Sequence, residues 1–564
     1  MAWTCRIELN NEKLSNFNVS THFSDRFSED KVFIKNDADC IVIDGVILNK
    51  SELQSSYGLA LPELAKNNLW GGTAQQFVNE LRGPFTGLFL HTGNLCAFGN
   101  QTGDASVFYY GDAATVIISS DFNEAVKECR NNNKTLTFNE VYANHILSFG
   151  YAVEGNTVIK EIKKVNPGCY ITIERGKIVE KVYHRFETKK REISIEQAVD
   201  ELDVAFRKAV KRCFGKDLEY GYMHHLADMS GGFDSRMTSW VAHDMGYRDV
   251  TNITYSKSGS FEEIYGRQVA QALGNEFIFE YLDDVAFIFD LEKLVSMNFG
   301  LATYVGITGG QKILSGIDFA KFGLEHTGQL GDVVVGSFCK RPEDDSAKSI
   351  RNLQYGDWIT PIVMCAEQFE SQELFSLYYR GFSGTLMTHH IRRHYTEAVS
   401  PFIDVDFLQF CLSLPLEYRC GHKLYFKWLQ EKYSDALLIP STRKQPGEKK
   451  LSKKDIYHML PTWMRHAIIS VSKSLHIAGL ISDKQGMNPM DYWYQNNAGM
   501  RSFINGYFSE HIAEMSSYPD VVTDLRKVFD QGRTMDKLLV LTVVAAFHLY
   551  IVDTAWMDSS QKAK

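Results

Sequence analysis

Ser230-Gly231-Gly232-Phe233-Asp234-Ser235 is the stretch that decides the fold of this chain. It follows a short, weakly apolar run, Met223 to Met229, and it opens a run with helical spacing at Met237 and Trp240. We therefore predict a strand, a glycine turn and the start of a helix, an arrangement that binds phosphate groups on backbone N–H groups. The two glycines let the chain pass close to a ligand, because neither has a Cβ.

The side chains of this loop suit a magnesium pyrophosphate group. Asp234 offers a hard oxygen for Mg²⁺, and Ser230 and Ser235 offer hydroxyls to phosphate oxygens. No Gly-x-x-x-x-Gly-Lys-Ser/Thr string occurs, which excludes a Walker loop. The loop looks like the pyrophosphate-binding loop of enzymes that split ATP into AMP and pyrophosphate. The alternative is a serine-glycine turn that caps a helix.

Length, composition and charge indicate a globular protein with two domains. The chain has 564 residues, of which 44% are hydrophobic, and a formal net charge of −9. This favours a sizeable core and argues against general binding to nucleic acids or membranes. Ten cysteines without a Cys-x-x-Cys pair are typical of reduced thiols in a cytoplasmic protein. The apolar run Leu538 to Val552 is too short to span a bilayer comfortably, so we expect a buried helix.

The chain divides into a β-rich domain, residues 1–187, and an α/β domain, residues 194–564. Short β-rich runs separated by Asp, Asn and Gly turns predict the strands of the first domain. Ser194 with Gln197 resembles a capping box and starts a helical pattern. Strand-like and helical runs then alternate, which predicts a parallel sheet with helices on both faces and ligands at the carboxyl ends of its strands. After about residue 370 the pattern is mainly helical.

A second glycine-acid string is Thr327-Gly328-Gln329-Leu330-Gly331-Asp332. Chemistry that releases pyrophosphate from magnesium ATP benefits from a metal held on both sides. Asp332 is the candidate for this second ligand, facing Asp234 across the sheet. Taken alone the string predicts only a loop turn, and its pairing with the first string reverses that interpretation.

Two further strings lie nearer the C-terminus, at Ser400–Asp404 and at Ser441–Gly447. Ser441 to Gly447 is part of a basic stretch in which Arg443 and Lys444 are candidates for stabilising charge on a pentavalent phosphate or a tetrahedral intermediate. A solvated loop is the alternative for the later lysines of this stretch. Ser400-Pro401-Phe402-Ile403-Asp404 carries no obvious chemistry and is expected to orient the site.

With these four strings in order, the chain resembles the asparagine synthetase family over nearly its whole length. The synthetase domain of that family carries Ser-Gly-Gly-x-Asp-Ser, a Gly-Glu/Gln-Gly-x-Asp-Glu string, a Pro-Phe-Leu-Asp element and a basic motif. The resemblance implies a PP-loop ATP pyrophosphatase domain with a helical extension, and ATP and Mg²⁺ as cofactors. It implies a nucleotide site formed by nine residues: Met229, Ser230, Gly231, Gly232, Asp234, Ser235, Tyr255, Thr327 and Gly328.

The same resemblance implies roles in metal binding and catalysis. Asp234 and Asp332 would hold Mg²⁺, and Lys444, Gln329 and Asp234 would be the catalytic residues. Two departures from the family pattern matter here. Gln329 stands where many members have Glu, so a carboxylate base is absent at that point, although other members also carry Gln there. Val333 replaces a common Glu and removes one charged contact near the metal.

The N-terminal half resembles the glutaminase domain of the family, an Ntn-hydrolase-like β-rich sandwich. A working glutaminase of this kind needs a cysteine as the first residue of the mature chain. Ala2 follows the initial methionine here, and Cys5 could serve only after cleavage behind Thr4. Asn100-Gln101-Thr102-Gly103 stands where the family has Asp-Arg-x-Gly. We therefore expect a degenerate domain that no longer hydrolyses glutamine.

These expectations add up to an ATP-dependent ligase that adenylates a carboxylate and passes it to an amine. Members of the family that lack the cysteine include β-lactam synthetases and lasso-peptide cyclases, which favours intramolecular ring closure on a small-molecule or peptide carboxylate. A precursor peptide is then a candidate partner and a homodimer a candidate assembly. The alternatives are asparagine-synthetase-like amidation with ammonia and a non-catalytic nucleotide-binding scaffold.

Overall fold

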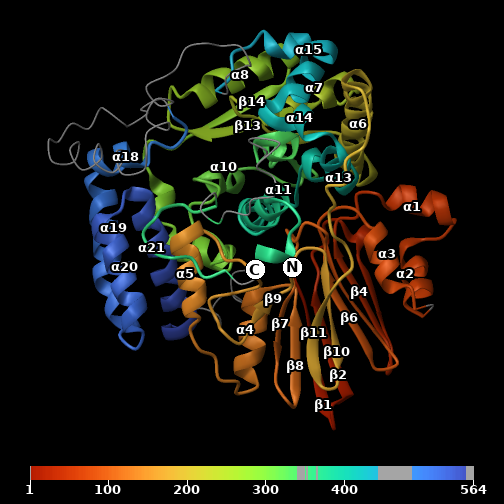
Figure 1. Cartoon of the computed structure of the whole chain (residues 1–564), viewed down its shortest axis with the longest axis vertical. Helices are drawn as coiled ribbons and strands as arrows, with labels where there is room; N and C mark the ends of the chain where they lie inside the picture. Colours follow the sequence, from red (N-terminus) through yellow and green to blue (C-terminus); the bar gives the residue numbers. More distant parts are fainter. Residues whose placement is uncertain are drawn as a thin grey trace.

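The structure, a computed structural model, describes residues 2–70, 72–338, 350, 353–363, 366–442 and 486–553. These residues form two antiparallel sheets, one parallel sheet and helices around all three (Figure 1). The predicted α/β class is therefore confirmed.

The N-terminal half contains both antiparallel sheets. One has the strand order β2-β1-β8-β7-β9 and the other β11-β10-β6-β5-β4-β3. The strands are β1 Ala2–Asn10, β2 Lys13–His22, β3 Val32–Lys35, β4 Cys40–Gly45, β5 Phe85–His91, β6 Asn94–Gly99, β7 Phe108–Gly111, β8 Thr115–Ser119, β9 Lys163–Lys164, β10 Cys169–Glu174 and β11 Lys177–Val182.

The two antiparallel sheets pack face to face, with helices on their outer sides. Trp3, Cys5 and Ile7 alternate along β1 and point into the core between the sheets, where they meet Leu88 and Leu90 of β5. A second core lies between the outer face of the β4-β5 sheet and three helices, α1 Lys50–Tyr57, α2 Leu61–Trp70 and α3 Ala74–Glu80. On the other side α4 (Phe122–Asn131) packs on β7 and β8, and α5 (Glu140–Phe149) follows it.

The C-terminal half is built on the parallel sheet, whose strand order is β14-β13-β12-β15-β16. Its strands are β12 His225–Asp228, β13 Val250–Ser256, β14 Glu276–Tyr281, β15 Glu325–His326 and β16 Ala398–Val399. Chain order runs from β12 outward to β14 on one side and from β15 to β16 on the other. The order therefore reverses between β12 and β15, and such a reversal marks the ligand-binding crevice of open α/β sheets.

Helices cover this sheet and extend beyond it. They are α6 Ile195–Glu219, α7 Asp234–Asp244, α8 Phe261–Leu273, α9 Leu291–Met297, α10 Gly310–Ser315, α11 Gln372–Ser376, α12 His389–Arg392, α13 Val405–Ser413, α14 Leu416–Arg419, α15 Lys423–Lys432, α18 Met490–Asn496, α19 Ala498–His511, α20 Pro519–Gln531 and α21 Thr534–Phe547. In Figure 1, α8 and α10 lie on opposite sides of β13 and β14.

The apolar run near the C-terminus forms α21 and the turn after it, η13 (His548–Val552). Among the described residues, Thr534–Val552 is the one stretch long and apolar enough to cross a membrane, with a mean hydropathy of 1.8. Of its most apolar 18-residue window, 72% is buried inside the protein, where α21 packs on α5, α9, α19 and α20. It is therefore a core helix, as the sequence predicted.

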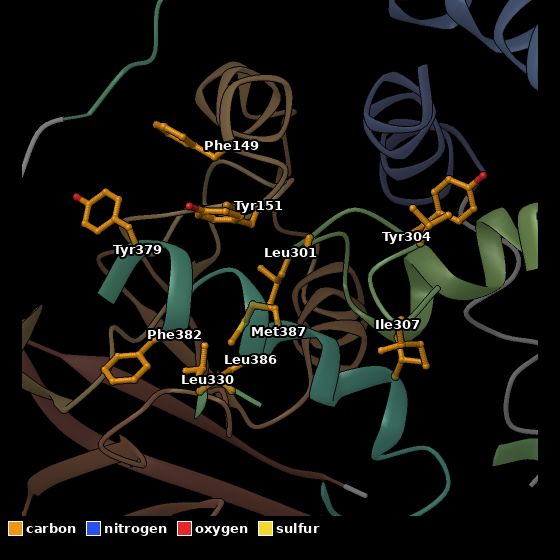
Figure 2. Close-up of a cluster of buried hydrophobic side chains, with 14 of the residues drawn as sticks. Phe149, Tyr151, Leu301, Tyr304, Ile307, Leu330, Tyr379, Phe382, Leu386 and Met387 are labelled. Atoms are coloured by element: carbon orange, nitrogen blue, oxygen red, sulfur yellow. The ribbon is translucent and has the colours of Figure 1, made fainter. Parts of the chain in front are cut away.

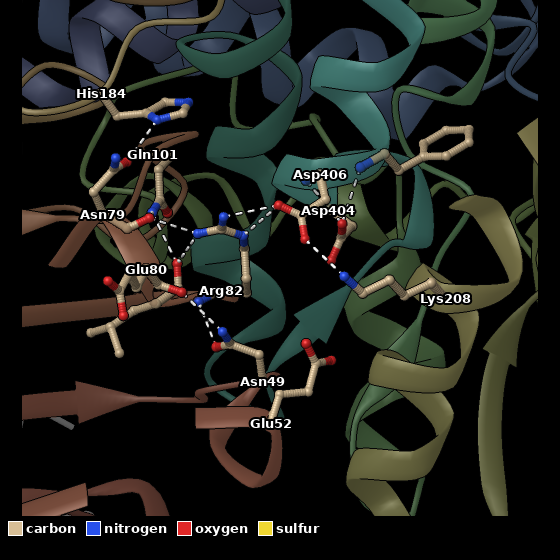
Figure 3. Close-up of polar contacts among 12 residues, drawn as sticks. Asn49, Glu52, Asn79, Glu80, Arg82, Gln101, His184, Lys208, Asp404 and Asp406 are labelled. Carbon is tan, nitrogen blue, oxygen red and sulfur yellow. Dashed lines mark hydrogen bonds and ion pairs between the residues drawn. The ribbon is translucent and has the colours of Figure 1, made fainter. Parts of the chain in front are cut away.

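The two halves share one interface and one core. The largest hydrophobic core contains side chains from α4 and α5 as well as from the parallel sheet and α21. At the surface of this contact Arg82 Nε and Nη2 donate to Asp406 Oδ1 at 3.0 and 2.9 Å (Figure 3). Arg212 Nη1 lies 2.8 Å from carboxylate oxygens of both Asp404 and Asp406. The element Pro401–Asp404 thus carries a buried ion pair with α6, and the same Arg212 also pairs with Glu52 of the N-terminal half.

The expected domain boundary falls in the connection between β11 and α6. β11 ends at Val182, and α6 begins at Ile195, where the Ser194 side chain accepts a hydrogen bond from the N–H of Gln197 as the capping pattern predicted. Because the halves share a core, the division into two domains stays a prediction.

The cysteines differ from expectation at one position. Seven of those described are free thiols, whereas Cys420 is disulfide-bonded. The prediction of reduced thiols throughout is therefore wrong at Cys420.

Candidate functional site

The two glycine-acid strings follow the two strands at which the order of the parallel sheet reverses. The loop Ser230–Ser235 leaves β12 and leads into α7, and the string Thr327–Asp332 leaves β15. β12 and β15 are neighbours in parallel register, with Leu226 opposite Glu325 and Ala227 opposite His326. Both strings therefore emerge at the same edge of the sheet, in the crevice where such sheets bind ligands.

The first loop is held by its own hydroxyl groups. The Ser235 hydroxyl accepts a hydrogen bond from the N–H of Ser230 at 2.9 Å and contacts the Ser230 hydroxyl at 2.8 Å. The N–H of Gly232 donates to Ser230 Oγ at 3.2 Å, and that of Gly231 donates to the Glu262 carboxylate. Burial raises the pKa of Glu262. The serines, predicted as phosphate ligands, thus also fix the loop that opens α7.

Backbone contact joins the second string to the first. A Cβ built on Gly328 would lie 2.2 Å from the Ser235 nitrogen, and one built on Gly331 would lie 2.7 Å from both Cβ and Cγ of Asp234. Real Cβ atoms do not approach this closely, so only glycine permits the packing. The structure therefore brings Asp234 against the Gly331-Asp332 peptide, as the pairing of the strings predicted.

The middle of the second string is strained and anchored in the core. Leu330 has a φ of 62°. This is the left-handed backbone region, which residues other than glycine and asparagine rarely adopt. Its side chain is buried beside Phe382, Leu386 and Met387 (Figure 2). The buried side chain fixes the peptide between the two glycines. Strained backbone of this kind clusters at functional sites.

The polar residues of the second string have separate anchors. Gln329 donates from Nε2 to the Thr388 hydroxyl at 3.2 Å, and its carbonyl accepts from the Ser400 hydroxyl at 3.0 Å. Its buried Oε1 has no hydrogen-bond partner among the described residues. Asp332 Oδ2 accepts from the Ser337 hydroxyl at 2.9 Å. Ser400, from the string Ser400–Asp404, thus orients the string Thr327–Asp332, as the sequence led us to expect.

The segment that leads to the basic string is pinned on the first loop. Ser441 Oγ and the N–H of Thr442 each donate to the Gly231 carbonyl at 3.0 Å. Arg236, in the first turn of α7, donates to the carbonyls of Ala436 and Ile439 at 2.8 Å and of Pro440 at 2.7 Å. Arg443 and the predicted catalytic Lys444 lie outside the described residues.

A buried ion cluster under the site was missed by the sequence. Arg392 of α12 lies 3.1 Å from Asp228 Oδ2, donates to Tyr255 Oη at 3.0 Å and is paired with Glu325. Burial and the neighbouring Asp228 carboxylate raise the pKa of Glu325 well above its ordinary value, although Arg392 opposes them. Asp228 ends β12, one residue before Met229, and Glu325 begins the short strand β15, two residues before Thr327. The sequence signal that could have indicated this cluster is Asp228, an acidic residue at the end of the short apolar strand β12.

Three predicted nucleotide-lining residues are buried by protein. Met229 packs on Val269 and Leu273 of α8, Tyr255 contacts Arg392, and Thr327 is fully buried, with its N–H donating to the Val399 carbonyl at 2.7 Å. In this structure Met229 and Thr327 position the loops through their backbone. Their predicted role in lining a nucleotide stays a prediction.

The N-terminal half has a cavity of about 530 Å³ where its first strand begins, bounded on the other side by α12. Its lining includes Asp44, Thr86, Ser120 and His390, and among the described residues it includes no cysteine. Cys5 lies instead in the core between the two antiparallel sheets, where burial raises the pKa of its thiol far above the ordinary value. Cys5 therefore does not face the cavity and cannot act there as a nucleophile.

The string Asn100–Gly103 serves the interface between the halves. Asn100 Nδ2 donates to Asp104 Oδ1 at 2.5 Å and to the Gly83 carbonyl at 3.0 Å. Asp104 Oδ2 lies 3.2 Å from His389 Nδ1 and 3.3 Å from Arg393 Nη2. Asn100 thus orients Asp104, which pairs with His389 of α12 and with the next residue after α12, Arg393.

Comparisons with known proteins leave the chain unassigned. No family model matches it, and no curated protein matches its sequence. Among solved structures it has a weak similarity to an allosteric regulatory enzyme of purine biosynthesis, with 7% identity and a TM-score of 0.22 over 50% of this chain and 74% of that one. It has a similarly weak likeness to the glutamine phosphoribosylpyrophosphate amidotransferase from B. subtilis. The identity is 8% and the TM-score 0.22, over 50% of this chain and 75% of that one. At this TM-score neither similarity carries an argument about fold or function.

Proposed function

We propose that the chain is an ATP-dependent, AMP-forming carbon–nitrogen ligase with a PP-loop ATP pyrophosphatase half and a degenerate Ntn-hydrolase-like half. One observation carries the proposal: the loop Ser230–Ser235 and the string Thr327–Asp332 meet in backbone contact where the order of the parallel sheet reverses. A glycine turn that opens a helix offers N–H groups to phosphate oxygens. In this structure the N–H groups of Ser230, Gly231 and Gly232 donate to oxygens of Ser235, Glu262 and Ser230, so a bound phosphate would replace these acceptors. Two aspartates on touching loops then supply hard oxygen ligands beside that anion site.

The chemistry follows from these positions. A carboxylate oxygen of the substrate attacks the α-phosphorus of ATP, the bond to pyrophosphate breaks, and an acyl-adenylate forms. The loop Ser230–Ser235 binds the departing pyrophosphate. The carboxylate oxygens of Asp234 and Asp332 fit Mg²⁺, which when bound would neutralise pyrophosphate charge. An amine then attacks the acyl carbon, AMP leaves, and the amine nitrogen loses a proton.

Lys444 and Gln329 are the proposed catalytic partners. Lys444 stabilises negative charge in both transition states, and loss of one such preorganised charge costs roughly 10²–10³ in rate. Gln329 cannot act as a carboxylate base. Its buried Oε1, which has no partner among the described residues, could instead accept a hydrogen bond from a bound substrate.

The amine does not come from glutamine in this proposal, because the N-terminal cavity has no cysteine among its described lining residues and Cys5 is buried. We favour an amine on the substrate itself and ring closure of a small-molecule or peptide carboxylate. Free ammonia is the second source. A cytoplasmic location and a homodimer belong to the same proposal. In that location the Cys420 disulfide would be one of the rare disulfides of cytoplasmic proteins.

Pyrophosphate exchange into ATP tests the proposal. Purified protein is incubated with ATP, labelled pyrophosphate and panels of small and peptide carboxylates, as wild type and as Asp234→Asn. We expect carboxylate-dependent exchange that falls at least about 10²-fold in the variant. The matched control is Asp244→Asn at the other end of α7, whose carboxylate pairs with Arg207 at the surface. The ligase proposal would be contradicted if none of the carboxylates supported exchange. It would also be contradicted if Asp234→Asn exchanged pyrophosphate as fast as the wild type.

A further inference from the structure

Two imidazoles and one carboxylate converge on the C-terminal helices, away from the crevice of the parallel sheet. His511 ends α19, Glu514 lies in the following turn, η12 (Ile512–Met515), and His548 follows α21. His511 Nδ1 lies 3.0 Å from Glu514 Oε1, and His548 Nδ1 lies 2.9 Å from Glu514 Oε2. The two imidazole centroids are 4.3 Å apart. One potential ligand atom of each residue lies within 4.8 Å of those of the other two.

We propose that His511, Glu514 and His548 bind a divalent transition-metal ion of the Zn²⁺ class. Two imidazole nitrogens and a carboxylate oxygen are a ligand set that Zn²⁺ prefers, and three protein ligands leave the fourth tetrahedral position to water. The ion would replace the two imidazole–carboxylate contacts with coordinate bonds to the same atoms. This site is independent of the proposed ligase reaction.

The surroundings of the cluster suit an ion that enters from solvent. The side chains of His511, Glu514 and His548 are 12%, 25% and 17% exposed, so each is held by neighbours yet reachable. Tyr507 stacks on the His511 ring with centroids 4.3 Å apart, which fixes that ring. Glu510 Oε2 lies 4.0 Å from His511 Nε2, on the side of the ring away from Glu514. The second ring nitrogen of a metal-bound histidine commonly donates to a carboxylate, a carbonyl or water, and at 4.0 Å Glu510 lies beyond hydrogen-bond distance of it.

A second cluster of two imidazoles and one carboxylate, Asp217, His225 and His326, is too deeply buried to take up an ion. Asp217 Oδ2 lies 2.7 Å from both His225 Nδ1 and His326 Nε2, and Asp217 Oδ1 accepts from the N–H of Leu324. All three side chains are buried, and His326 stacks on Phe214 with centroids 3.8 Å apart. The second cluster is thus sealed from solvent, and its Asp217 carboxylate is already shared by the two imidazoles and a backbone N–H.

Binding of the ion would fasten two segments that are far apart in sequence. His511 ends α19 and Glu514 lies in the following turn η12, whereas His548 begins η13, directly after the core helix α21. A ligand that binds only the folded state stabilises it by mass action. The expected role is therefore structural, with the ion clamping the C-terminal helical layer.

Metal titration of the full chain tests the site. Protein freed of metal by chelation is titrated with Zn²⁺ while Tm is followed, and separately with Co²⁺ while its visible absorption is recorded. We expect one ion per chain, a rise in Tm of a few degrees, and Co²⁺ bands of a four-coordinate site. His511→Gln and His548→Gln should each lower affinity at least tenfold, and Glu514→Gln provides a milder third variant.

The matched control is His224→Gln, since His224 also lies between two carboxylates, Asp249 and Glu276, but has no second imidazole. It should bind like the wild type. Absence of stoichiometric Zn²⁺ or Co²⁺ binding by the wild type overturns the proposal whether or not the variants fold. Binding that survives in all three site variants, with unchanged Co²⁺ bands, overturns it equally.

Discussion

Two glycines decide whether the aspartates of the site can share a ligand. Gly328 and Gly331 lie against Ser235 and Asp234 so closely that a Cβ has no room at either position. Their neighbour Leu330 takes a left-handed conformation and buries its side chain, which holds the peptide between them. The geometry of the proposed metal ligands therefore rests on residues that carry no functional group.

Gly331→Ala tests this at the residue scale. The new Cβ would meet Cβ and Cγ of Asp234 at 2.7 Å, so one of the two loops must move. A displacement of about 1 Å costs on the order of 10² in rate, and we expect that loss in pyrophosphate exchange. The control is Gly506→Ala in α19, where a Cβ meets no atom within 4 Å. It should keep full exchange and stabilise the helix by about 0.5–1 kcal/mol. Equal exchange in both variants would contradict the argument.

At the scale of elements, α7 does more than present its N-terminus. Arg236 in its first turn binds three carbonyls of the segment 436–440, and Thr442 returns to Gly231. The same helix start thus holds the predicted phosphate loop and the chain that leads to Arg443 and Lys444. Burial lowers the pKa of Arg236 to about 10, which leaves the guanidinium charged at neutral pH.

Arg236→Lys is the variant for this element. Lysine keeps the charge but lacks the planar fork that binds several carbonyls at once. We expect a loss of stability of about 2 kcal/mol, since hydrogen bonds to charged groups contribute about 1.5–3 kcal/mol, and a fall of at least roughly tenfold in exchange. Denaturant unfolding and the exchange assay measure the two effects. Arg267→Lys, a surface residue of α8 paired with Glu263, serves as control. Wild-type behaviour of Arg236→Lys would show that the segment is positioned by other contacts.

At the scale of the whole molecule, charge fastens the two halves together. Arg82 from the N-terminal half and Arg212 from α6 converge on Asp406, and Arg212 also binds Asp404 and Glu52. Burial alone would raise the pKa of Asp406, but the two guanidinium groups outweigh it and lower the pKa well below its ordinary value.

The sign of the pH dependence follows from that lowered pKa. A carboxyl with a depressed pKa in the folded state stabilises it above the unfolded pKa, about 3.9, and this contribution is lost as the pH falls through the folded pKa. Asp406→Asn should therefore have a lower Tm than the wild type at pH 7, and the gap should narrow progressively as the pH falls below about 4. Thermal unfolding from pH 7 to pH 2 measures it, with Asp244→Asn as the surface control. A gap that is constant over this range would contradict the assignment.

The elements near the loop were predictable because their patterns are local. Ser194 caps α6 as predicted. The strand that the residue pattern predicts at Asp249–Tyr255 forms at Val250–Ser256, and the helix that it predicts at Glu262–Leu273 forms at Phe261–Leu273. The helices α1 to α3 were missed within a region predicted as mostly β. Their apolar side chains, such as Leu53, Leu64 and Phe77, are read as core only once the outer face of the β4-β5 sheet lies beneath them.

The sequence by itself determined the turn chemistry of Ser230–Ser235, the parallel α/β architecture around it and the order of the strings that follow, because each depends on neighbours within a few residues. Only the tertiary structure decided that Gly331 touches Asp234, that Asp228, Glu325 and Arg392 form one buried cluster, and that Cys5 is sealed in the core. Those contacts join residues far apart in sequence. Packing, rather than local conformation, selects them.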